Sequence, residues 1–182
     1  MGPPQFIGEL MKNLLMTIVA LFVAAYASAD NVSEIQIING TPNGDYYLTG
    51  KVHGKLGWSA WALVSESWAE TYAGPTFAPA KWIEVGIAAG IETPGARFEE
   101  CLWLGKGRFS VLAVAEQGAS GPWHRIIAKM DVGHGFTVGY HDQAVVGRGL
   151  HAAFTRGKVT LRTALLVKGG KVGAILAIAV GS

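Results

Sequence analysis

The chain of 182 residues has the length of one domain, and its 50% hydrophobic and 15% charged content is too apolar for a disordered segment. The net charge is only +2 and lysines and arginines do not cluster, so we expect no nucleic acid among the partners. The single cysteine, Cys101, excludes an intrachain disulfide, and packing, sheet hydrogen bonds or lipid must stabilise the fold instead.

Residues 1–29 predict a secretory signal peptide with an N-terminal extension. Lys12 supplies a positive charge, residues 14–26 form an apolar run, and the sequence Ala-Ser-Ala at 27–29 matches a cleavage site. A retained anchor helix is the alternative, but the run is shorter than the roughly 20 residues that a membrane helix needs. We therefore expect an exported chain in which residues 30–45 lead into one domain over 46–182.

From residue 46 onward, apolar residues alternate with small or polar ones, which is the period of two typical of β-strands. The pattern predicts a first, long strand over 46–65. Residues 68–80 are ambiguous because Pro75 and Pro79 interrupt the alternation. Further strands are expected over 81–91, 97–104, 109–115, 125–132, 136–141, 146–154, 159–167 and 172–180.

Short glycine-containing segments separate these strands. Residues 105–107, 133–135, 156–158 and 169–170 suit tight hairpins, because glycine tolerates positive φ. Successive hairpins predict an all-β fold, an antiparallel meander closed into a small barrel of about 8–10 strands. In such a barrel the last strand, 172–180, would close against the strand over 46–65.

Alternation alone leaves two architectures open. A soluble β-sandwich turns its apolar face inward, whereas a membrane barrel turns it outward to lipid. The polar face of this chain is rich in glycine and alanine and poor in charge compared with a soluble surface. Aromatic residues also gather near the predicted strand ends, as they do at the two interfaces of a membrane barrel. Together with the export signal, these features favour the barrel.

Three stretches then resemble the strands of small bacterial outer-membrane β-barrel proteins: WIEVGIAAGIE (82–92), RFSVLAVAE (108–116) and GRGLHAAF (147–154). The resemblance covers residues 46–182 and is one of architecture. It implies a location in the bacterial outer membrane, with membrane lipid as a partner; the periplasm or secretion is the alternative location. The chain departs from the pattern at Ser182, where such barrels commonly end in an aromatic residue.

If the apolar face meets lipid, the charged residues of the other face line the lumen, in a structural role or as part of a solute-binding site. The predicted lumen residues are Lys51, Lys55, Glu84, Glu99, Arg125, Lys129, Asp131 and Arg162. Their charges have both signs and can pair, and a barrel of about eight strands is filled by its side chains. We therefore expect no wide pore.

The sequence contains no recognisable catalytic or metal-binding motif. No serine lies in a G-x-S-x-G turn. His134 and His141 would lie about 23 Å apart along an extended strand, and no cysteine or carboxylate cluster completes a ligand set. We expect no enzymatic activity, no metal and no cofactor. The leading hypothesis is a barrel for structure or small-solute passage or binding; the alternatives are a secreted or periplasmic β-sandwich that binds a ligand, and a lipid-modifying barrel enzyme.

Overall fold

The computed structural model describes residues 30–93 and 95–181, so the predicted signal peptide and Ser182 lie outside the described residues. The described chain forms twelve β-strands, and no helix in it is long and apolar enough to cross a membrane. The strands are β1 (Asp30–Ile38), β2 (Thr41–His53), β3 (Leu56–Ser65), β4 (Ala69–Ala80), β5 (Ile83–Glu92), β6 (Ala96–Lys106), β7 (Phe109–Gly118), β8 (Gly121–Gly133), β9 (Phe136–Gln143), β10 (Gly147–Arg156), β11 (Val159–Lys168) and β12 (Lys171–Gly181).

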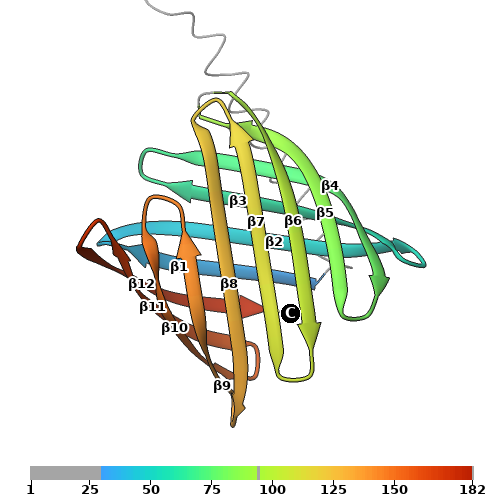
Figure 1. The fold of residues 1–182 in the computed structure, drawn as a ribbon. Coiled ribbons are helices and arrows are strands. Elements are labelled where there is room, and N and C mark those ends of the chain that lie inside the picture. Colours follow the sequence, from blue (N-terminus) through green and yellow to red (C-terminus); the bar gives the residue numbers. More distant parts are fainter. Residues whose placement is uncertain (1–29, 94, 182) are drawn as a thin grey trace, which may run out of the picture.

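Each strand pairs antiparallel with its neighbours in sequence, and β1 also pairs with β12, which closes the sheet into a barrel. Figure 1 shows β1, in blue, running between β2 and the red strands of the C-terminus. The predicted fold class, an antiparallel meander closed into a barrel, is confirmed. The sandwich alternative is wrong, because a closed sheet satisfies its own edges and leaves no second sheet to pack against.

The strand count and the closing pair differ from the sequence-based expectation. The barrel has twelve strands rather than about 8–10, and β12 closes against β1 rather than against residues 46–65. Residues 46–65 are two strands, β2 and β3, separated by a two-residue turn in which Gly54 has φ 57°. Beyond an irregularity between Lys51 and His53, even-numbered residues of β2 pair with even-numbered ones of β3, as Gly50 does with Trp58. The alternation therefore continues from one strand to the other. Residues 30–45, expected as a lead-in, hold β1 and the start of β2.

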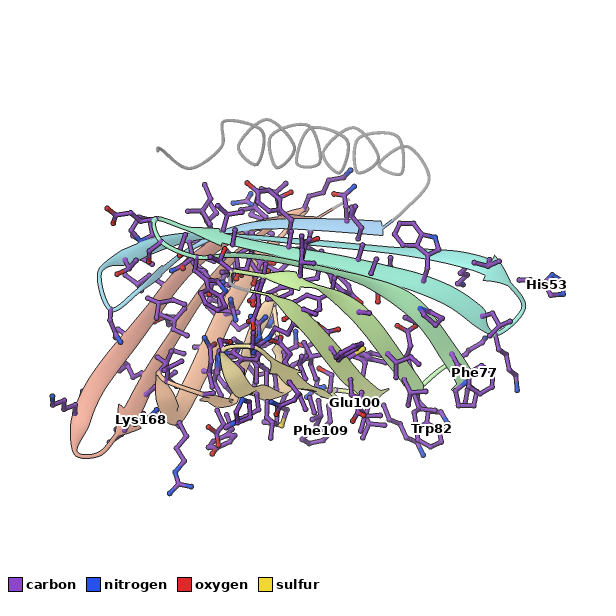
Figure 2. All side chains as sticks on the ribbon, turned by 90° about the horizontal axis from the view of Figure 1, so that it is seen from above. His53, Phe77, Trp82, Glu100, Phe109 and Lys168 are labelled. Carbon is purple, nitrogen blue, oxygen red and sulfur yellow. The ribbon has the colours of Figure 1, made fainter. Side chains whose placement is uncertain are left out.

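The outward face of the barrel is apolar. Large apolar side chains on this face are well exposed, and Leu150 reaches 75% and Leu176 57%. Seen from above in Figure 2, Phe77, Trp82 and Phe109 point away from the barrel. This polarity is the reverse of that in a soluble domain, in which such side chains are buried, and it is typical of a barrel whose wall faces lipid.

The inward face is polar over most of its area and apolar at one end. Val146, Ala164, Leu166 and Ile175 form a buried cluster, with Ile38 packed against it, at the end where β1 turns into β2 and β11 into β12. Connections between the described strands are no longer than three residues. The interior is therefore filled by strand side chains rather than by an inserted loop.

Candidate functional site: a charged network inside the barrel

Asp45, in the middle of β2, is the centre of the interior network. Its carboxylate accepts hydrogen bonds from Gln36 Nε2 at 3.0 Å and from Trp61 Nε1, which come from the two neighbouring strands β1 and β3. Arg125 Nη1 lies 3.3 Å from Asp45 Oδ2 and supplies the positive charge. A carboxylate with three donors around it is well satisfied in a largely buried position.

Arg125 reaches Asp45 from the opposite wall. Five strands separate β8 from β2 in either direction around the barrel, so this ion pair spans the interior. The guanidinium also lies over two tryptophan rings, 5.6 Å from the centroid of Trp61 and 5.3 Å from that of Trp123. Such cation–π contacts fix the arginine in the bridging position. Arg125 and Asp45 meet across the lumen, so at this level the only open passages are the gaps beside these two side chains.

A second ion pair crosses one strand. Arg162 on β11 donates two hydrogen bonds to the carboxylate of Glu34 on β1, from Nε at 3.1 Å and from Nη2, and thereby passes over β12. The residues of β12 that lie beside this pair are Ala177, opposite Arg162, and Ala179, opposite Glu34. Alanine leaves room for the two long side chains. This explains why the inward-facing residues of β12 are small rather than polar.

A third cluster surrounds Arg97 on β6. Its guanidinium lies 2.6 Å from Glu92, 2.9 Å from Glu116 and 3.9 Å from Glu70. The side chains of Glu92 and Glu116 are 0% and 1% exposed. Tyr72 donates to Glu116 at 2.9 Å. One arginine therefore holds three carboxylates in a buried position, which concentrates negative charge on this part of the wall.

The clusters around Asp45 and Arg97 are continuous. The Trp61 ring, which donates to Asp45, stacks on Tyr72 with the ring centroids 5.3 Å apart, and Tyr72 contacts Glu116. Side chains from β2, β3, β4, β5, β6, β7 and β8 thus belong to one connected set of contacts. We expect a substitution at one of these residues to weaken the hydrogen bonds and ion pairs of the others, since the contacts in a network of buried polar groups depend on one another.

Two histidines face the interior on the adjacent strands β9 and β10. His141 and His151 are 0% and 4% exposed, and their ring centroids lie 6.2 Å apart. His141 Nε2 lies 3.1 Å from Gln143 Oε1, while the Nδ1 atoms of both rings have no hydrogen-bond partner within the described residues. By register, His151 lies opposite Ala164 of the apolar cluster, and Gly149 pairs with both His141 and Leu166, so the two histidines border the apolar cluster.

Charge is unevenly distributed around the interior. The register places five carboxylates and one arginine on the inward face of β4–β7, and four cations and one carboxylate on that of β8–β11. The acidic wall comprises Glu70, Glu84, Glu92, Glu99 and Glu116 with Arg97, and the basic wall comprises Arg125, Lys129, Arg162 and Lys168 with Asp131. Glu34 and Asp45, on β1 and β2, neutralise two of the four cations of the basic wall.

The inward face remains open at the end opposite the apolar cluster. A hollow of about 340 Å³ lies there, lined by residues that include Trp103, Ser110, Lys129, Asp131 and Thr137. The register places these five on the inward face of β6–β9. The interior thus combines an open end, a charged middle and a packed apolar end.

The sequence predicts eight residues that line the lumen, and the structure places them in two groups. Seven of them lie on the inward face by register: Lys51, Glu84, Glu99, Arg125, Lys129, Asp131 and Arg162. Lys55 lies instead in the turn between β2 and β3. The ion pairs of the described residues join none of the eight to another; Arg125 and Arg162 pair with Asp45 and Glu34, and Asp131 accepts a hydrogen bond from the backbone of Gly133.

Several residues of the network were not predicted. Glu34 and Asp45 fall in residues 30–45, which the sequence predicts to lead into the barrel domain. The alternation of β1, with Ile35 and Ile37 outward and Glu34 and Gln36 inward, is the signal that could have found them. The remaining residues missed were Glu70, Glu92, Arg97, Glu116, His141 and His151, whose inward positions follow from the same parity.

The described residues contain no cluster of three or more metal-ligating side chains. Two serines and one histidine that could in principle support hydrolytic chemistry, Ser59, Ser110 and His124, fall on different faces. The register turns Ser59 and Ser110 inward, whereas His124 points outward, where it lies 3.4 Å from Asp142. A Ser/His pair from these residues therefore does not form in this structure.

A closed antiparallel barrel with an apolar outer face and a charged interior is the fold of small outer-membrane β-barrel proteins, which confirms the resemblance seen in the sequence. Among solved structures, the chain is similar to the KdgM porin, with a TM-score of 0.57, 6% sequence identity, and 83% of this chain and 98% of the porin covered. A structure described as the NanC porin matches with a TM-score of 0.51 and 10% identity over 84% of this chain and 98% of that one. No family model and no curated protein matches the chain.

Proposed function

We propose that the chain is a bacterial outer-membrane barrel for the binding or passage of small solutes, with the interior network as its constriction. The observation that carries this proposal is the Arg125–Asp45 ion pair, which joins opposite walls of the barrel. The likeness in fold to the KdgM and NanC porins supports a channel rather than an enzyme.

The arrangement along the interior indicates what size of solute can pass. The hollow beside Lys129 and Asp131 offers an entrance at one end. The ion pairs of Arg125 and Arg162 narrow the middle, and the cluster around Leu166 and Ile175 packs the other end. A solute larger than a few atoms would have to displace a paired charge, which costs several kcal/mol in a buried position. The barrel therefore suits ions and very small solutes, or serves as a closed structural element.

The test combines extraction and conductance. A membrane barrel should need detergent for extraction, migrate differently on a gel before and after boiling, and insert into a planar lipid bilayer. Wild-type protein should give a small conductance, and Arg125→Ala should raise it because the side chain that bridges the walls is gone. Arg148→Ala, on the outward face of β10, is the control and should leave the conductance unchanged.

Two results would contradict the proposal. Recovery of the folded protein as a soluble monomer would remove the membrane location. Equal conductance of the wild type and Arg125→Ala, with both proteins folded and inserted, would show that the Arg125–Asp45 pair does not limit passage.

A further inference from the structure

The two ends of the barrel differ sharply in charge. Five hairpins lie at the end where β1 begins and β12 ends: β2–β3, β4–β5, β6–β7, β8–β9 and β10–β11. Their turn residues, with one strand residue on either side, contain six lysines and arginines and no aspartate or glutamate. These six are named here the basic collar: Lys55, Lys81, Lys106, Arg108, Arg156 and Lys158.

The same count at the opposite end gives two cations, Lys168 and Lys171, and two carboxylates, Glu66 and Glu92. The net charge of the turns is therefore +6 at one end and zero at the other. The six side chains of the basic collar are exposed, and none of them takes part in an ion pair of the described residues. Within the described residues, the cations of the collar are thus left without an ion-pair partner.

Each of the five hairpins repeats the same order of side chains. A lysine, arginine or histidine is followed within two residues by the first residue of the returning strand, which is large and apolar. These apolar residues are Leu56, Ile83, Phe109, Phe136 and Val159. Four of them are at least 40% exposed, with Phe109 at 64%. The order of cation and apolar residue is thus repeated around the whole rim.

The register places part of the collar on the lipid-facing side rather than over the mouth of the lumen. Lys106 pairs directly with Phe109, and Arg156 with Val159, so each cation shares the outward face with an exposed apolar side chain. A lysine or arginine beside an apolar group at a membrane surface extends its charge to the headgroups while its stem stays in contact with acyl chains.

We propose that the basic collar binds the phosphate groups of anionic phospholipids, with the apolar residue of each hairpin against the acyl chain of the same lipid. The inference rests on the membrane location in the proposed function. The repeated pairing of a cation with an apolar side chain matches an amphiphile better than a soluble anion, for which the apolar neighbours would have no use. Attraction of this kind amounts to about fivefold in affinity for each lysine or arginine near the lipid surface.

The experiment measures which lipids the folded barrel retains. Wild-type protein is reconstituted in a bilayer of phosphatidylglycerol and phosphatidylethanolamine in equal amounts, extracted gently, and weighed with its bound lipids by native mass spectrometry. We expect phosphatidylglycerol to be enriched severalfold over its share of the bilayer. The enrichment should fall when the salt concentration rises from about 0.1 M to about 1 M, which shortens the screening length from about 10 Å to about 3 Å.

Two matched double variants locate the effect. Lys106→Gln with Arg156→Gln removes the two cations of the basic collar that lie on the outward face, and Arg148→Gln with Lys171→Gln removes two cations near the other end. The collar variant should lose most of the enrichment and the control variant little of it. Equal losses in the two variants, or no enrichment in the wild type, would overturn the proposal.

The competing occupant, a soluble anion drawn to the mouth of the lumen, gives a different result. In that case the collar variant would lose anion selectivity in a bilayer recording and keep its bound phosphatidylglycerol, which also overturns the proposal. Failure of the wild type to insert into any bilayer would instead count against the proposed function, so the two failures are distinguishable.

Discussion

Replacement of Asp45 by alanine is expected to be the most damaging single change in the interior. It removes the counter-charge of Arg125 and also the acceptor of Gln36 Nε2 and Trp61 Nε1. The side chains of Arg125 and Asp45 are only 11% and 10% exposed. Removal of one partner from a largely buried ion pair costs about 3–5 kcal/mol of the free energy of unfolding. Arg125→Ala should cost less, about 2–3 kcal/mol, because Asp45 keeps two hydrogen-bond donors.

The assay is urea unfolding of the refolded barrel in lipid vesicles, followed by tryptophan fluorescence, since Trp61 and Trp123 flank Arg125. Asp131→Ala is a matched control: the same residue type, on the inward face, but exposed and bonded only to the backbone of Gly133. It should cost about 1 kcal/mol or less. If Asp45→Ala and Asp131→Ala lower the free energy of unfolding equally, the reasoning from the cross-barrel ion pair is refuted.

Three further predictions concern other parts of the barrel. Ala177→Leu should destabilise the fold by about 1–3 kcal/mol in urea unfolding because it overfills the space beside the Arg162–Glu34 pair, whereas Ala174→Leu, on the outward face of β12, should be nearly neutral. Tyr72→Phe removes one of the two hydrogen-bond donors of Glu116, leaving only Arg97 Nε, and should cost about 1–2 kcal/mol in the same assay; no effect would mean that the Tyr72–Glu116 hydrogen bond is not formed in the folded barrel. Leu176→Arg places a charge in the middle of the outward face and should lower the stability in vesicles by about 2–4 kcal/mol, and a neutral result would contradict lipid contact.

The alternation of residue types was enough to predict the closed barrel but not its strand count. A two-residue turn by itself reverses parity, but the irregularity between Lys51 and His53 adds one residue and restores it. The pattern therefore runs through Gly54 without a break, and β2 and β3 look like one strand. The length of residues 46–65 does indicate two strands, because a single strand of 20 residues would extend well beyond a bilayer. β1 was missed because its inward residues, Glu34 and Gln36, resemble a polar lead-in when the pairing with β12 is unknown.

The inward position of Arg125 and Arg162 follows from local parity, but their partners do not. Asp45 lies 80 positions from Arg125 in the sequence and Glu34 lies 128 from Arg162. Only the closure of the barrel brings these side chains together. The small residues of β12 looked like an argument against a polar lumen, and the structure shows that Ala177 and Ala179 make room for an ion pair anchored on the strands to either side.

The β1–β12 ladder has a consequence for how the barrel forms. Eleven of the twelve strand pairings join neighbours in sequence through turns of two or three residues, so most of the sheet can form by local zippering. The twelfth, in which Val32 lies opposite Gly181, joins the two ends of the domain and must be the slow, long-range step. Because the two ends are adjacent, a chain with Gly181 linked to Asp30 and cut at any hairpin would trace the same barrel. In such a circular permutant the slow pairing moves to the new cut, and β1–β12 becomes an ordinary hairpin.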